Sequence, residues 1–521
     1  MLLTLAAEGE VSNVDTSEPP ASQRRRLRLF YSLIQSQEYL RAAHLSECWL
    51  QPDATSALLS FLHFFARYLA GEKERLDGLA DVLEREQSEA AANSQLKPLL
   101  RDLARWRHEE PLHFDHFHAY LLGMVAKGLG LGAEAEESLL SCLQRAPHFW
   151  PAWLELAHSL ASREQLSRLE LPEHWMKELF LIEAHLTLQS AEDALMVVER
   201  LEGRGSPLLE TDYLIARIGA AKHMAMDCEG ARESFRKIRE RSPYRLDHMG
   251  DFANTLFVLA ENMDCARTEL CSLAKHCFRV DQFSAQTCFV LGNYFGQRNE
   301  HEKAVEYHQR AVRLDPSNTS AYILMGHEFM ELKNTPAATL AYRQALELNP
   351  KDFRAWYAMG TSYDLLQMPS YSAHYFMQAH KAKPQDSRFL IALGDMLAAK
   401  GKKADAKACY WRAHCVGDLD GHALFKLASA LEEEGGKDAE AASCYWSYLK
   451  SAQDSTDRDE ESEAKSYQFL TQYAAAQEKW DAALSFAQCC LQYPLTKNRG
   501  KHFMQLASEA KMKAMNQTSP S

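Results

Sequence analysis

The 521-residue sequence has the composition of a folded protein, with 46% hydrophobic and 25% charged residues. Its 71 acidic and 58 basic side chains give a formal net charge of −13, which repels phosphate backbones, so we expect no nucleic-acid partner. The most apolar run, residues 58–69, is interrupted by His63 and Arg67 and is too short to cross a bilayer. We therefore expect a soluble, intracellular protein without a membrane partner.

The N-terminal residues 1–23 show no hydrophobic periodicity and contain the sequence SEPP, which predicts a disordered tail. The basic run RRRLR at residues 24–28 has two interpretations, a nuclear-localisation patch or the solvated start of a helix. Because the run is short and comes directly before a helical pattern, we favour the helix start.

From residue 24 to residue 280 the sequence predicts paired helices with a faint internal repeat. Gly123 is followed by alanine after 12 residues and by proline after 24, and Gly219 has the same spacing. The glycines within residues 128–132 fall between two such helices, with no strand before them, and are typical of a turn rather than of a phosphate-binding loop. The charged stretch 76–110 fits no repeat, and we predict a linker there.

Residues 281–450 keep the same spacing strictly. Gly292, Gly326, Gly360 and Gly394 lie 34 residues apart, and a proline follows each of the first three after 24 residues. Small residues allow two helices to approach closely, and proline ends the second helix of a pair. A 34-residue period with these positions is the tetratricopeptide pattern. The sequence therefore predicts an all-α tetratricopeptide-repeat solenoid, a superhelix of antiparallel helix pairs.

The C-terminal part departs from this regularity. Residues 451–463, SAQDSTDRDEESE, are acidic and polar, which predicts an exposed loop. We expect a last helix pair over residues 464–512 and a tail over residues 513–521.

Motifs of catalysis and metal binding are missing from the sequence. None of the twelve cysteines forms a C-x-x-C pair, and His113, His116 and His118 do not have the i, i+4 spacing of helical zinc ligands. Neither a G-x-S-x-G elbow nor a G-x-x-x-x-G-K-[ST] loop occurs. We therefore expect no enzyme, no metal and no cofactor, and thiols that stay reduced and mostly buried.

A peptide-binding groove is the remaining candidate site. In such solenoids the first helices of successive repeats line a concave surface, and the groove takes the positions between their apolar stripes. Amide, hydroxyl and carboxylate groups over an apolar floor suit an extended peptide that carries a basic side chain. The candidate residues are Phe289, Asn293, Ile323, His327, Met330, Tyr357, Thr361, Asp364, Ile391 and Asp395, with Arg354 and Arg388 near the mouth.

Several stretches are more specific than the repeat consensus requires, and they resemble the subunit 8 family of the anaphase-promoting complex, or cyclosome. The resemblance runs in blocks from about residue 27 to residue 420. The blocks include YLRAAHL (39–45), FARYLAGEKE (65–74), CFVLGNYF (288–295), GHEFMELKNT (326–335), RAWYAMG (354–360) and DSRFLIALGDM (386–396).

This resemblance implies a non-catalytic scaffold subunit of a cell-cycle ubiquitin ligase, present in nucleus and cytoplasm. Members of the family form homodimers through their N-terminal repeats and stack on related repeat subunits, in an assembly that also contains cullin and RING subunits. Their C-terminal groove receives a short motif of activator proteins, so the resemblance implies activator docking for the candidate groove residues.

Two alternatives remain at this stage. A chaperone cofactor that holds C-terminal carboxylates would need several cationic and amide side chains converging in the groove. The candidate groove offers Asn293 inside and the two arginines at its mouth, with acidic residues between them. An enzyme chain is the other alternative, which turnover by the purified protein would revive.

Overall fold

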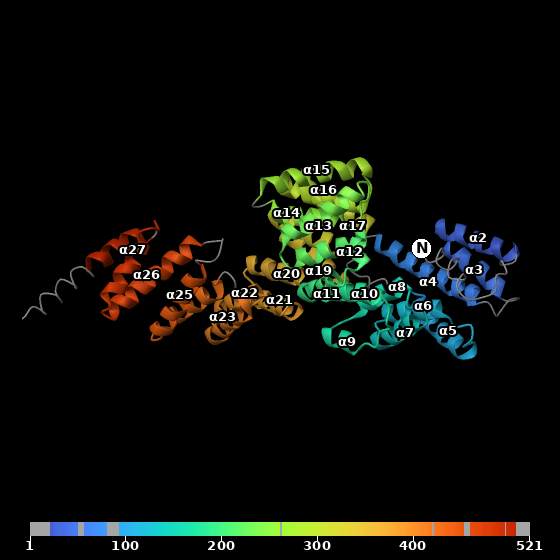
Figure 1. The fold of residues 1–521 in the computed structure, drawn as a ribbon, viewed down its shortest axis with the longest axis horizontal. Helices are drawn as coiled ribbons and strands as arrows, with labels where there is room; N and C mark the ends of the chain where they lie inside the picture. Colours follow the sequence, from blue (N-terminus) through green and yellow to red (C-terminus); the bar gives the residue numbers. More distant parts are fainter. Residues whose placement is uncertain are drawn as a thin grey trace, which may run out of the picture. The chain divides into compact units, whose positions relative to one another are not determined.

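The computed structural model describes residues 21–50, 57–80, 93–260, 263–418, 421–452, 459–494 and 496–506. Within these ranges all regular structure is helical, as Figure 1 shows, and the predicted all-α class is confirmed. The chain forms two compact units, Met1–Leu259 and Ala260–Ser521.

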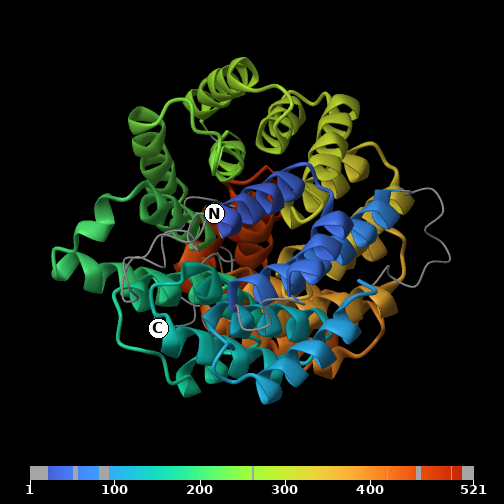
Figure 2. The same ribbon diagram turned by 90° about the vertical axis from the view of Figure 1, so that its right-hand side faces the viewer.

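The first unit consists of successive helices, most of which pack on the next helix in the chain, while α8 (Trp150–Ser159) packs on α10 (Met176–Thr187). In Figure 2 the helices within residues 96–159, coloured blue to teal, lie side by side. The helices are α2 (Ala21–Gln35), α3 (Tyr39–Leu50), α4 (Ala57–Ala80), α5 (Leu96–Glu109), α6 (His116–Gly128), α7 (Gly132–Arg145), α8 (Trp150–Ser159), α9 (Arg163–Arg168), α10 (Met176–Thr187), α11 (Ala191–Gly203), the 3₁₀ helix η3 (Pro207–Glu210), α12 (Asp212–Met224), α13 (Cys228–Arg241) and α14 (Met249–Leu259).

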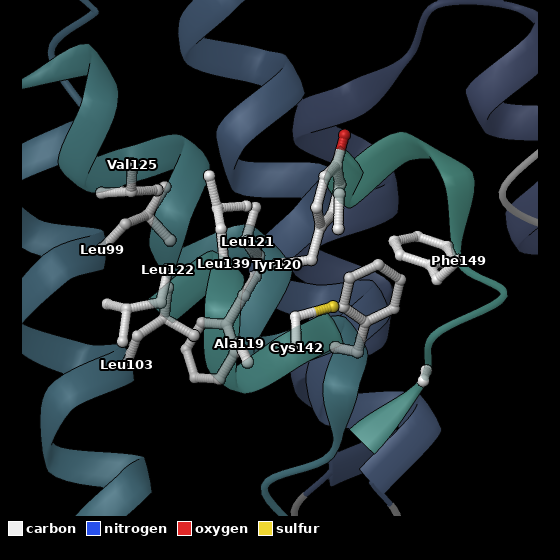
Figure 3. Packing of buried hydrophobic residues seen from close by; sticks show 14 of the residues in the cluster. Leu99, Leu103, Ala119, Tyr120, Leu121, Leu122, Val125, Leu139, Cys142 and Phe149 are labelled. Carbon is white, nitrogen blue, oxygen red and sulfur yellow. The ribbon is translucent and has the colours of Figure 1, made fainter. Parts of the chain in front are cut away.

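The core of the first unit is apolar and continuous across helix pairs. Figure 3 shows Leu99 and Leu103 of α5 directed at Val125 and Leu122 of α6, and all four side chains are buried. Full burial of one such side chain stabilises the fold by about 1.5–3 kcal/mol.

One histidine of the cluster near the start of α6, His118, takes part in this packing. His118 is fully buried, and its Nδ1 lies 2.7 Å from the Asp115 carboxylate, which also caps α6. Its Nε2 lies 3.0 Å from the Ser60 hydroxyl of α4. Both ring nitrogens are thus occupied by protein groups.

The second unit contains the strict repeats. Its helices are α15 (Asp264–Val280), α16 (Ala285–Gln297), α17 (His301–Leu314), α18 (Thr319–Glu331), α19 (Thr335–Leu348), α20 (Phe353–Leu365), α21 (Pro369–Ala382), α22 (Ser387–Ala399), α23 (Lys403–Gly417), α24 (His422–Glu434), α25 (Asp438–Ala452), α26 (Glu460–Ala476) and α27 (Trp480–Cys490), and residues 497–506 are also helical.

One contact repeats in each helix pair and explains the glycine series. The aromatic ring 16 residues after the glycine lies directly over it, so that a Cβ built at Gly326, Gly360 or Gly394 would lie 2.3–2.5 Å from a ring carbon of Tyr342, Phe376 or Tyr410. Because real Cβ atoms do not approach carbon so closely, these positions require glycine while the ring stays in place.

The turn inside each strict repeat also has a fixed geometry. Asn299, Lys333, Gln367 and Gly401, again 34 residues apart, all have a positive φ, between 57° and 77°. This left-handed residue ends the first helix and reverses the chain for the second. Only one of the four is glycine, so the other three repeats carry a backbone cost of about 1 kcal/mol each.

The boundaries predicted for several segments need correction. The predicted array boundary at residue 280 is wrong, because α15 packs on α16 and belongs to the second unit. The predicted linker at 76–110 is too wide, since α4 reaches Ala80 and residues 96–109 form α5, while residues 81–92 lie outside the described residues.

The predicted acidic loop at 451–463 is also too wide. Helix α25 runs to Ala452 and α26 begins at Glu460, where the Asp459 side chain accepts the N–H of Glu461 and caps the helix. Residues 453–458, the predicted tail 513–521 and residues 1–20 lie outside the described residues, and residues 21–23 are helical. The last helix pair, predicted at 464–512, is α26 and α27, with a further helical stretch at 497–506.

Candidate peptide-binding groove

The candidate groove residues lie on the first helices of four strict repeats, α16, α18, α20 and α22. Three of them are buried: Phe289, Asn293 and Ile323 are 2%, 2% and 4% exposed. Phe289 packs on the ring of His308, with 5.6 Å between the ring centroids. These three predicted groove residues therefore lie within the helix packing and are not open to solvent.

In two of the strict repeats the residue directly after the glycine carries a polar group that meets the second helix. His327 Nδ1 lies 2.9 Å from the hydroxyl of Tyr342, and one oxygen of Asp395 accepts the hydroxyl of Tyr410 at 2.7 Å. Burial, together with this hydrogen bond to a carboxylate, raises the pKa of Tyr410. Desolvation by the surrounding protein, with the Arg354 cation nearby, lowers the pKa of His327 although the residue reaches the surface.

Asp395 is held from a second side. Its other oxygen lies 3.2 Å from the ammonium of Lys426 on α24, at the start of the next repeat. Lys426 is not among the groove residues predicted from the sequence. A charged residue two positions before Ala428, the small residue that replaces the repeat glycine, was the available signal.

The two arginines at the mouth are bound to their own helix caps. Arg354 donates from Nε and Nη2 to the two oxygens of Asp352 at 3.0 and 2.8 Å. Arg388 does the same with Asp386 at 3.0 and 2.7 Å. Each aspartate also accepts the backbone N–H of the arginine and so caps its helix. We call these the Asp–Arg forks.

The Asp–Arg fork at α22 changes the pKa of Asp386. Burial alone would raise the pKa of Asp386, but the hydrogen bonds from Arg388 and the nearby charge of Lys383 outweigh it and lower this pKa. The guanidinium side chains are 43% and 58% exposed in Arg354 and Arg388, so each fork keeps a face open to solvent.

The apolar floor is made by the remaining candidates. The Tyr357 ring lies between Phe376 and Phe389, with 5.4 Å between ring centroids on each side. Burial raises the pKa of Tyr357, while the charge of Arg388 acts in the opposite direction.

Met330, Thr361, Ile391 and Asp364 complete the candidate set. The Met330 sulfur accepts the hydroxyl of Ser362 at 3.6 Å, the Thr361 hydroxyl donates to the Ala358 carbonyl at 2.9 Å, and Ile391 is half-buried. Asp364 is exposed at the end of α20. Of the two predicted acidic groups, Asp364 has no side-chain partner among the described residues, whereas Asp395 is shared between Tyr410 and Lys426.

Three further features, a metal-ligand cluster, disulfide bonds and a membrane-spanning helix, are absent from the described part of the chain. No group of three or more potential ligand side chains there could hold a metal ion, and all twelve cysteines are free. Among the same residues no helix combines the length and apolarity that crossing a membrane requires.

Comparison with known proteins gives matches to one family over part of the chain. Residues 12–203 match the family described as anaphase promoting complex subunit 8 / Cdc23, and residues 285–318 and 319–352 match the tetratricopeptide repeat. The resemblance to the subunit 8 family is confirmed.

Curated relatives carry the same family name. The chain is 33% identical over 290 residues to the anaphase-promoting complex subunit 8 of Arabidopsis thaliana, which covers 56% of this chain and 48% of the relative. It is 38% identical over 221 residues to the cell division cycle protein 23 homolog of Homo sapiens, covering 42% and 36%. The chain thus spans about half or less of the length of these subunit 8 relatives.

A solved structure supports the fold. The crystal structure of the APC/C hetero-tetramer Cut9–Hcn1 matches 97% of this chain and 99% of its own chain, with a TM-score of 0.51 and 16% identity. Together with the repeat matches and the helix pairs, it confirms the tetratricopeptide-repeat fold class.

Proposed function

We propose that this chain is a non-catalytic scaffold subunit of the anaphase-promoting complex. The observation that carries the proposal is the match of residues 12–203 to the subunit 8 family, because this family is more specific than the tetratricopeptide repeat matched elsewhere in the chain. Helices α2–α11 lie within the matched residues. Its partners are the related repeat subunits and, through the assembly, the cullin and RING subunits. The chain forms a homodimer through its N-terminal repeats, and the assembly works in nucleus and cytoplasm.

The test is affinity purification of the tagged full chain from dividing cells, followed by mass spectrometry. Recovery of cullin, RING and repeat subunits in fixed ratio supports the scaffold. Recovery of chaperones alone, or of no stable partner, contradicts it. Light scattering of the purified chain then measures the dimer, and imaging of the tagged chain through the cell cycle measures the localisation.

We further propose that the groove docks an activator motif that carries a basic side chain. The exposed Asp364 supplies the uncommitted carboxylate, and Tyr357 with Ile391 supplies the apolar floor. Asp395 contributes less, because the Lys426 ammonium already offsets its charge.

Charge reversal separates these roles. Asp364→Lys weakens binding of an arginine-containing activator peptide about tenfold, which corresponds to about 1.4 kcal/mol. Asp395→Asn has a smaller effect, and Glu347→Lys, an exposed residue of the second helix α19, serves as the matched control. Unchanged binding by both Asp364→Lys and Asp395→Lys contradicts this groove assignment.

The chaperone-cofactor alternative is less favoured by the same geometry. Arg354, Arg388 and Lys426 are each paired with an aspartate, so a C-terminal carboxylate would have to compete for every cation. A peptide with a free carboxyl terminus that binds as tightly as the basic activator peptide would favour that alternative.

A further inference from the structure

A second concave site lies in the second unit, away from the candidate groove. A pocket of about 360 Å³ opens between the end of α15, the start of α16 and the end of α17. Pockets that bind ligands begin at about 300 Å³. None of the candidate groove residues lines it.

The mouth of this pocket exposes large apolar side chains. Phe278, Phe283 and Leu314 are 48%, 75% and 54% exposed. Single exposed apolar residues are common, but three around one hollow mark a binding surface, because a ligand that covers them gains about 25 cal/mol for each Å² removed from water.

The pocket is held in a fixed shape. The Asp281 carboxylate accepts the backbone N–H of Phe283 at 2.9 Å, and the N–H of Asp281 donates to the Cys277 carbonyl at 3.0 Å. Cys288 is buried and lies with its sulfur 4.0 Å from the Gln282 carbonyl. The most exposed ring, Phe283, therefore stands on a hydrogen-bonded turn, so little conformational entropy is lost when a ligand packs on it.

Two arginines, Arg310 and Arg313, line the pocket on a chain that is acidic overall. Arg310 lies over the Tyr307 ring at 5.1 Å and pairs with Glu306 one turn earlier on α17. Arg313 is exposed and has no side-chain partner among the described residues. Glu306 is paired with Arg310, and Asp281 accepts only a backbone N–H, so Arg313 is the cation at the rim that is left without a side-chain partner among the described residues.

We propose that this pocket binds a short peptide segment of a partner protein in which a large aromatic side chain is flanked by acidic residues. The aromatic ring enters the hollow between Phe283 and Leu314, and a neighbouring carboxylate accepts hydrogen bonds from the Arg313 guanidinium. An aromatic anchor with a charged rim contact is the usual arrangement of a small interface hot spot. The occupant differs from the basic motif proposed for the groove, so the two sites can be tested separately.

Fluorescence polarisation with the full chain tests this site. The probe is a fluorescein-labelled nine-residue peptide with a central tryptophan and two acidic residues on each side. We expect saturable binding that weakens about tenfold in Arg313→Glu and in Phe283→Ala, a typical effect for a hot-spot position. Replacing the tryptophan of the peptide by alanine, or its acidic residues by lysine, reduces binding by a similar factor.

Matched controls come from the exposed face of α19. Arg343→Glu and Leu340→Ala repeat the two chemical changes at exposed residues that do not line the pocket, and both keep wild-type affinity. Circular dichroism melts show whether each variant is folded. Equal binding by the Arg313 and Phe283 variants, or equal binding of the lysine peptide, overturns the proposal. Self-association of the chain also overturns the proposal if Phe283→Ala abolishes it and the peptide does not compete with it. In that case the occupant of the pocket is a second copy of the chain.

Discussion

Replacing Gly360 by alanine tests the contact that sets the helix spacing in the strict repeats. A Cβ at this position would lie 2.5, 2.6 and 3.0 Å from Cε1, Cδ1 and Cζ of Phe376. Favourable carbon contacts lie near 3.5–4.0 Å, so the ring or the helix must move, at a cost of about 1–3 kcal/mol. Alanine returns about 1 kcal/mol of helix propensity. The expected net destabilisation is therefore about 1 kcal/mol.

The assay is urea unfolding followed by circular dichroism, with hydrogen exchange of α20 and α21 as a local readout. In a Phe376→Val background the three contacting ring atoms are gone, and Gly360→Ala should then stabilise by up to about 1 kcal/mol. Gly203→Ala in α11, where a Cβ meets nothing within 4 Å, is the control and should also stabilise. Destabilisation by Gly360→Ala of the same size in both backgrounds would refute the ring as the constraint.

Three further changes test other features of the repeats. Lys333→Gly relieves the positive φ of 57° and should leave stability unchanged or raise it by up to about 1 kcal/mol in urea unfolding, whereas a clear loss contradicts the strain argument. His308 is buried, and neither of its ring nitrogens has a hydrogen-bond partner among the described residues. Desolvation lowers the pKa of His308 to about 3, so the unfolded state binds its proton first as pH falls. His308→Phe should stabilise by about 1 kcal/mol at pH 7 and by more below pH 6.5, and an unchanged pH profile of unfolding would contradict this. Asp386 has a lowered pKa, and the sign of its pH dependence follows from that. Its contribution to folding stability is complete above the ordinary aspartate pKa and is lost as pH falls through the lower pKa of the folded state. Asp386→Asn should therefore destabilise the fold by about 1 kcal/mol at pH 7 and by less below about pH 4, as measured by unfolding at several pH values. A loss of stability that does not depend on pH would mean that the helix cap, and not the charge of Arg388, is what matters.

Helix pairs in the second unit could be predicted because their determinants are local. Glycine under a ring and a left-handed residue seven positions after the glycine act within one repeat, so the 34-residue period reports them directly. The C-terminal boundaries were less accessible. Acidic residues such as Glu460 and Glu461 look like a loop by composition, yet they form the first turn of α26, where negative charge is favourable.

The exposure and pairing of the groove residues could not be predicted from the pattern of a single repeat. Phe289 and Tyr357 occupy the same position of the repeat, three residues before the glycine, so the repeat pattern predicts the same exposure for both. In the structure Phe289 is buried, whereas Tyr357 is only half-buried beside Phe389. What decides exposure is the neighbouring repeat, which a single repeat pattern does not contain. The pairing of Asp395 with Lys426 has the same origin, because the two residues belong to different repeats.

The Asp–Arg fork at α20 has a mechanical consequence. Besides its own cap, Arg354 approaches the Ser320 hydroxyl of the preceding repeat at 3.4 Å, and Ser320 stands 34 residues earlier. Neighbouring repeats are thus joined by many modest contacts, each between adjacent units in the chain, as in other repeat arrays. A tensile load along these helices would be shared among successive small steps, and the strict repeats would extend and recoil like an elastic element instead of rupturing at a single barrier.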